Sequence, residues 1–175
     1  DSQAELHVGA IEAHLAPQTG ISIVLLDDHV FRIRVSGGAL NVRIPRMNEG
    51  EAVEAQTDFG NFRLLGVGAY RLDAPREAGF ASITVRSGAA QAIAAGRSYA
   101  VAAGQRLVLS GNPPAPDIME APAPDPWDEW CASRDEVTER SLEISEQYVS
   151  WEVAGAEELA QYGDWEIDDT YGPCW

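Results

Sequence analysis

The residues of this chain that could carry out chemistry are few: three histidines, two cysteines and one acidic cluster near the C-terminal end. His7, His14 and His29 lie in segments with strand or turn patterns, and none has the i, i+4 helical spacing of two zinc ligands. We therefore interpret them as surface or rim histidines. The sequence contains no nucleophile-elbow or phosphate-loop motif. It predicts a chain that is not an enzyme and uses no cofactor.

The acidic cluster brings Asp164, Glu166, Asp168 and Asp169 together. It lacks the alternating Asp/Asn ligands, the central glycine and the final glutamate of an EF-hand loop. We interpret it as a plain acidic loop, with calcium binding as the less favoured alternative.

The only cysteines, Cys131 and Cys174, are 43 positions apart. A disulfide between them would close a loop around the C-terminal tail and stabilise the fold by roughly 4 kcal/mol on the chain-entropy account. We expect this bridge, with two unbridged thiols as the alternative. Disulfides persist outside the cytosol, so the bridge predicts a periplasmic or extracellular protein.

Charge is distributed very unevenly along the chain. The formal net charge is -16, and every basic residue is an arginine. Residues 1–111 carry 11 acids and 10 arginines, whereas residues 112–175 carry 17 acids and only Arg134 and Arg140. So acidic a tail disfavours nucleic acid and anionic membrane surfaces as partners. No apolar run approaches the ~18 residues of a membrane span, so we expect no membrane insertion. The acids form either a solvating surface or a docking site for a basic partner.

The elements that must position these residues are mainly strands between residues 3 and 110. Apolar and polar residues alternate on both sides of Gly37-Gly38, which predicts a hairpin with its turn at the two glycines. Similar runs recur every ~8–12 residues, and Gly66 and Gly68 are expected at bulges or points of close approach. We therefore predict a mainly β fold, a two-layer β-sandwich or rolled β-sheet of short antiparallel strands.

The remainder of the chain predicts a different organisation. Residues 112–126 contain six prolines, and we interpret them as a linker or surface strap. Asp125 can cap a helix that begins at Pro126, of two to four turns and broken near Ser141. A second short helix is expected over residues 156–163, ended by Gly163. All five tryptophans lie at or beyond position 127, so we expect this helical tail to pack on the β domain, anchored by Trp127 and Trp130.

Four short motifs occur in a fixed order: V-x-G-G-A-L-x-V (Val35 to Val42), G-A-Y-R-L (Gly68 to Leu72), I-T-V-R-S-G-A (Ile83 to Ala89) and A-x-x-A-G-Q-R (Ala100 to Arg106). Their order and spacing resemble the FecR domain, the extracytoplasmic β-domain of bacterial surface-signalling regulators and of many other exported proteins. Residues 148–175 are similar to the start of an uncharacterised Trp/Tyr-rich segment that follows FecR domains in secreted proteobacterial proteins. The resemblance implies a FecR-like domain at 1–111, whose first strands precede Asp1, then the linker at 112–126 and an acidic Trp-rich tail at 127–175.

The resemblance also implies an exported, non-catalytic module that binds an envelope or extracellular protein or assembles with itself. We expect the partner surface to consist of the remaining aromatic residues of the tail, namely Trp151, Tyr162, Trp165, Tyr171 and Trp175. They could instead form a small core within the tail. Four other functions remain open: a structural subunit of an envelope assembly, a hydrolase whose site matches no known motif, a cell-wall glycan-binding module, and an envelope signalling regulator.

Overall fold

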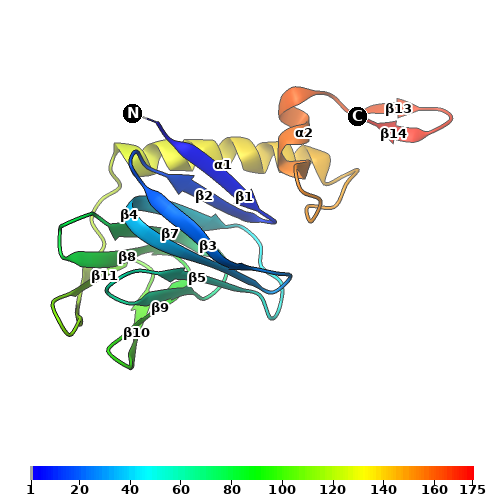
Figure 1. Ribbon diagram of the computed structural model, residues 1–175. Coiled ribbons are helices and arrows are strands. Elements are labelled where there is room, and N and C mark those ends of the chain that lie inside the picture. Colours follow the sequence, from blue (N-terminus) through cyan, green and yellow to red (C-terminus); the bar gives the residue numbers. More distant parts are fainter. Residues whose placement is uncertain (1) are drawn as a thin grey trace. The chain divides into compact units, whose positions relative to one another are not determined.

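The computed structural model describes residues 2–175, which form two compact units (Figure 1). The β unit comprises residues 2–6 and 11–123, and the C-terminal unit comprises residues 7–10 and 124–175. Twelve strands form one large sheet, so the predicted mainly β fold is confirmed. Its strands are β1 (Ala4–Val8), β2 (Ile11–Leu15), β3 (Gly20–Leu26), β4 (Val30–Ile44), β5 (Ala52–Gln56), β6 (Asn61–Leu64), β7 (Gly68–Ala74), β8 (Phe80–Ser87), β9 (Ala89–Ala94), β10 (Arg97–Ala102), β11 (Gln105–Ser110) and β12 (Ala115–Glu120).

The long strand β4 joins the two layers of this rolled sheet (Figure 1). Its first half lies between β3 and β5, in a layer that continues through β6, β9 and β10. Its second half lies between β2 and β7, in a layer that continues through β8, β11 and β12. The β4–β5 pair is parallel, and the other pairs along these two layers are antiparallel.

The hairpin predicted at Gly37-Gly38 is therefore wrong, because both glycines lie inside the single strand β4. The chain bends there instead of reversing. A Cβ on Gly37 would lie 2.6 Å from the side chain of Arg76, and a Cβ on Gly38 would lie 2.5 Å from the Thr19 Cα. Gly38 also has a φ of +93°, a conformation that glycine adopts at little cost. Thr19 holds the bend: its hydroxyl donates to the Ala39 carbonyl (2.9 Å) and accepts from the Ala39 N–H (3.1 Å).

The core of the β unit is built from the apolar positions of the alternating strands, as predicted. The side chains that are most completely buried include Val35, Leu40, Ile44, Phe62, Leu64, Tyr70, Leu72, Ile83, Val85, Leu107 and Leu109. Tyr70 is enclosed by glycines, because a Cβ on Gly68 or Gly88 would lie within 2.7 Å of its hydroxyl. That hydroxyl donates to the Gly66 carbonyl (2.9 Å), and burial raises its pKa. The expected close approach at Gly68 is thus present.

The proline-rich segment is more ordered than a linker. Residues 115–120 form β12, which pairs antiparallel with β11 and has no second strand partner among the described residues. Pro116 is tolerated because an edge strand needs a hydrogen-bonding ladder on one side only. The β unit accordingly extends to residue 123, beyond the predicted domain end at residue 111.

The C-terminal unit begins with the helix α1 (Pro126–Ser145). Asp125 caps it as predicted: its carboxylate accepts from the N–H groups of Trp127 and Asp128, both at 2.9 Å. The Asp128 carboxylate accepts in turn from the Asp125 N–H (3.1 Å), which completes a capping box. The prediction of two to four turns broken near Ser141 is wrong, since α1 runs unbroken through Ser141 for 20 residues.

Two further elements complete this unit. The helix α2 (Ala156–Tyr162) ends at Gly163, as expected. A two-stranded ribbon, β13 (Glu166–Asp168) and β14 (Gly172–Cys174), was not anticipated. Among residues 2–175, no helix combines the length and the apolar character that crossing a bilayer requires.

Candidate functional site

The C-terminal unit exposes several large side chains on the β13–β14 ribbon and at the end of α2, the helix that precedes the ribbon in the sequence. The Asp168 carboxylate accepts hydrogen bonds from the N–H groups of Thr170 (2.7 Å) and Tyr171 (2.9 Å), which shapes the turn between the strands. These two backbone hydrogen bonds lower the pKa of Asp168. The acidic loop therefore has a structural role, because one of its carboxylates forms the turn of the ribbon.

The ribbon presents different chemistry on its two sides. Ile167 pairs with Pro173, so both side chains point to the same side. Glu166 pairs with Cys174 and Asp168 with Gly172, so these residues face the opposite side. The ribbon is thus apolar on one side and acidic on the other, and its apolar side is open: 68% of Ile167 is exposed.

Four large side chains in this region are exposed to solvent by 57 to 82%, and we call them the C-terminal aromatic surface: Tyr162, Ile167, Tyr171 and Trp175. Trp175 is nevertheless fixed in place. Its indole N–H donates to the Leu159 carbonyl (3.0 Å), and its ring lies so close to Gly163 that a Cβ there would be 2.7 Å from it. The C-terminal residue is thereby anchored to the end of α2 while its ring stays accessible.

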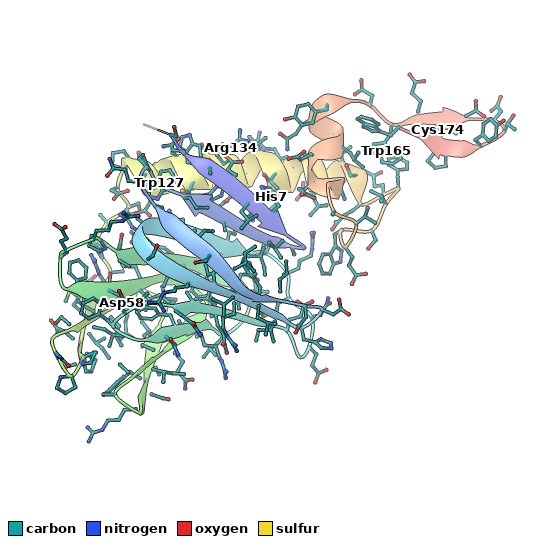
Figure 2. The ribbon with its side chains drawn as sticks, in the orientation of Figure 1. His7, Asp58, Trp127, Arg134, Trp165 and Cys174 are labelled. Carbon is teal, nitrogen blue, oxygen red and sulfur yellow. The ribbon has the colours of Figure 1, made fainter. Side chains whose placement is uncertain are left out.

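The structure separates the five aromatic residues that the sequence grouped as a partner surface. Tyr162, Tyr171 and Trp175 are exposed, whereas Trp151 and Trp165 are half-buried. Trp165 stacks on Tyr148, with ring centroids 4.6 Å apart (Figure 2 labels Trp165). Two of these side chains are thus partly packed within the tail and three face solvent, so the five do not form one continuous exposed set. Ile167 was missed, because an apolar residue in a three-residue strand gives too short a pattern to recognise.

The predicted disulfide is not formed. Cys131 is buried in α1. Cys174, which Figure 2 labels, is exposed at the end of β14. Cys131 belongs to the buried stripe of α1 with Thr138, Leu142 and Ser145, whereas Cys174 lies on the acidic side of the ribbon. The two thiols thus occupy different environments, and a bridge requires Cα atoms within about 7 Å of each other.

The charge of the C-terminal unit is almost entirely negative around this surface. Nine acids and no arginine or lysine lie between residues 141 and 175. A short N-terminal segment, residues 7–10, also belongs to this unit. Its His7 Nδ1 lies 3.2 Å from the Glu157 Oε1 on α2, a contact that nothing in the sequence indicated.

The two tryptophans near the start of α1 also interact with each other. The rings of Trp127 and Trp130 stack with centroids 5.0 Å apart and an interplanar angle of 13°. Both side chains are half-buried, and the Trp127 indole nitrogen is buried without a hydrogen-bond partner among the described residues.

The β unit contains an open cavity of about 380 Å³ at one end of its sheet. Phe59, Phe80 and Pro75 supply its apolar wall, and Asp58 and Arg76 its charged groups. No histidine or cysteine is among its lining residues. The side chains that the sequence considered for chemistry therefore do not meet there. The interpretation of the histidines as surface or rim residues is wrong for His14, which is buried in β2.

Comparison with known proteins finds a shared fold. No protein-family model matches this sequence, and no curated protein matches it. Two crystal structures of a "putative anti-sigma factor" from Parabacteroides distasonis are similar to it, each with a TM-score of 0.60. They are 14% and 13% identical to this chain and match 70% of its length. The chain spans 57% of the length of these neighbours, and the similarity is one of fold.

Proposed function

We propose that this chain is a protein-interaction module of an exported bacterial protein, with the C-terminal aromatic surface as its contact site. The observation that carries the proposal is the exposure of Tyr162, Ile167, Tyr171 and Trp175 on a fixed backbone. Apolar and aromatic side chains that stay in water in the free protein are typical of a surface that a partner covers. An isolated two-stranded ribbon is marginally stable in water, so a partner would also stabilise β13 and β14.

The charges beside this surface indicate the chemistry of the partner. With nine acids and no arginine or lysine between residues 141 and 175, the unit would repel an acidic protein and attract a basic one. The partner segment therefore combines arginine or lysine with apolar side chains. The apolar groups would cover Ile167 and the tyrosines, and the basic groups would meet the acids around them.

The proposed compartment is the periplasm or the cell exterior. It is supported by the resemblance of residues 1–111 to the FecR domain. The disulfide that would have supported the same compartment is not formed, so the resemblance alone supports export.

A second candidate function is envelope signalling. It is favoured by the fold shared with structures described as a putative anti-sigma factor. The test is transcript profiling after deletion of the gene in its own bacterium. A signalling role predicts a small, coherent set of changed transcripts, whereas a scaffold role predicts none.

The interaction proposal can be tested with a random peptide library displayed on phage and selected against the full chain. We expect enrichment of peptides that carry arginine or lysine next to aromatic or aliphatic residues. A selected peptide is then titrated by calorimetry against the wild type, Ile167→Ser and Ile118→Ser. Ile118 is the matched control, because it is an isoleucine of an edge strand with 45% exposure, in the β unit.

Ile167→Ser should weaken binding about tenfold or more, while Ile118→Ser should change it less than twofold. Binding should also weaken as salt is raised, because the acids of the unit are exposed. Enrichment of acidic peptides, or equal losses in the two variants, would contradict the proposal.

A further inference from the structure

Strand β3 is an open edge of the β unit. It pairs with β4 and with no other strand among the described residues. Backbone N–H and C=O groups along its other side therefore have no ladder partner, and such an edge is a template for another strand. Four consecutive apolar residues of β3 are 37 to 53% exposed: Ile23, Val24, Leu25 and Leu26.

The pairing with β4 shows that part of this exposure is on the core side of the sheet. Ile23 pairs with Ile33, and Leu26 pairs with Phe31. Directly paired side chains point to the same side, and Ile33 and Phe31 are fully enclosed in the core. The core therefore continues to the edge strand, but the opposite layer does not cover it there.

The other edges carry residues that discourage pairing, and β3 does not. Strand β12 contains Pro116, Asp117 and Glu120, and β10 begins with Arg97. Strand β1 contains Glu5 and His7. Charged residues and proline are the usual protection of an exposed edge. Residues 20–26 contain neither an ionisable group nor a proline, and their departures from a regular edge are the register shifts with β4 between Gly20 and Ile21 and between Ile23 and Leu25.

We propose that β3 pairs antiparallel with β3 of a second copy of this chain, which joins the two β units through one continuous layer. An antiparallel pair of identical strands has twofold symmetry, the commonest symmetry of soluble oligomers. The pairing would cover Ile23 and Leu26 and satisfy the open backbone edge of both copies. It concerns the β unit and is independent of the C-terminal aromatic surface.

Charge favours a second copy at this edge in particular. Two chains of net charge -16 repel each other, so a contact in which no acid faces another acid is favoured. In a pairing centred on Ile23, Leu26 lies opposite Gly20 of the second copy and Asp27 lies opposite its Thr19. Within each copy, the Asp27 carboxylate also accepts hydrogen bonds from the backbone N–H groups of His29 (2.9 Å) and Val30 (2.8 Å). No acid then faces an acid across the new pair.

The experiment is sedimentation velocity of the full chain between about 1 and 100 µM, at low and at high salt. The wild type should form a dimer of twice 18.9 kDa, and salt should strengthen it by screening the repulsion between the copies. Val24→Lys should weaken the dimer at least tenfold, because it places a charge at the edge. Met119→Lys on β12, which is similarly exposed, is the matched control and should leave the dimer unchanged.

Two further measurements keep the proposal falsifiable if Val24→Lys fails to fold. Mixing Val24→Lys with Val24→Glu should restore a dimer, since the two positions are diagonal neighbours across the new pair. In the wild type, hydrogen exchange of β3 amides should slow as concentration rises, while that of β12 amides stays constant. A wild type that stays monomeric at 100 µM, or equal disruption by Met119→Lys, would overturn the proposal.

Discussion

The core of the β unit and the C-terminal aromatic surface use their large side chains in opposite ways. In the β unit, Tyr70, Phe62 and Leu72 are enclosed in the core. In the C-terminal unit, Tyr162, Tyr171 and Trp175 face solvent, while the buried stripe of α1 includes Thr138, Ser141 and Ser145. The first arrangement stabilises a fold, because burying apolar area is the main favourable contribution to folding. The exposed side chains of the C-terminal unit have not yet been buried, so their apolar area can still contribute to the binding of a partner.

This difference implies that the core of the β unit carries stability, whereas the C-terminal aromatic surface is available for recognition. Changes in that core should affect global unfolding, and equivalent changes around the ribbon should affect local order or binding alone. Three matched pairs of substitutions test this division, beginning with the largest expected effect.

The first test compares two tyrosines, Tyr70→Ala and Tyr171→Ala. Tyr70 is 2% exposed and Tyr171 is 82% exposed. Removing the Tyr70 ring leaves a cavity and should lower the free energy of unfolding by about 3–5 kcal/mol. Tyr171→Ala should change it by less than about 0.5 kcal/mol, as for most surface substitutions. Urea denaturation followed by far-UV circular dichroism measures both values. Similar losses in the two variants would break the division.

The second test compares two glycines with similar backbone conformations, Gly38 in β4 (φ +93°) and Gly155 before α2 (φ +88°). Alanine at either position adopts a disfavoured φ, which costs about 1–2 kcal/mol. At Gly38 the new Cβ also meets the Thr19 backbone at 2.5 Å, whereas nothing lies within 4 Å of it at Gly155. Gly38→Ala should therefore lower the midpoint of global thermal unfolding by several degrees more than Gly155→Ala does. Equal shifts in calorimetry would show that the bend in β4 is not tightly packed.

The regular parts of the fold could be predicted from local sequence. Alternation identified the core strands, Asp125-Pro126 identified the start of α1, and Gly163 identified the end of α2. Each of these signals depends on neighbouring residues only, such as a side chain that caps the next turn. The same holds for Gly68, because the side chain that it approaches closely belongs to Tyr70, only two residues along the chain.

The missed features depend on contacts between distant residues. Two alternating runs around Gly37-Gly38 fit both a hairpin and a bent strand, and the contacts with Thr19 and Arg76 decide between them. The stripe of α1 contains threonine and serine, so its apolar periodicity is too weak to show its full length. In the candidate site, tryptophan is exposed at Trp175 and half-buried at Trp165, and only the fold separates the two.

The third and smallest effect concerns two carboxylates, Glu54 in β5 and Asp168 in the ribbon. Burial alone would raise the pKa of Glu54, but hydrogen bonds from Arg63 (2.6 Å) and Arg32 (2.7 Å) lower it below its ordinary value. The pKa of Asp168 is lowered by the N–H groups of Thr170 and Tyr171. A lowered folded-state pKa means that the stabilisation is present above the unfolded-state value, near pH 4, and is lost as pH falls through the folded-state value.

We expect Glu54→Gln to reduce global stability by about 1 kcal/mol at pH 7 and the difference from wild type to shrink below pH 4, because the wild type then loses the same ion pairs. Asp168→Asn should leave global unfolding unchanged at any pH, since the Asp168 carboxylate is fully exposed and an asparagine oxygen can accept the same hydrogen bonds. Acid should instead loosen the turn of the wild-type ribbon. The hydrogen-exchange rates of the Thr170 and Tyr171 amides should then rise, after correction for the pH dependence of the intrinsic exchange rate. A pH-dependent change in global unfolding with Asp168→Asn would show that the ribbon contributes to the stability of the fold and is more than a surface for binding.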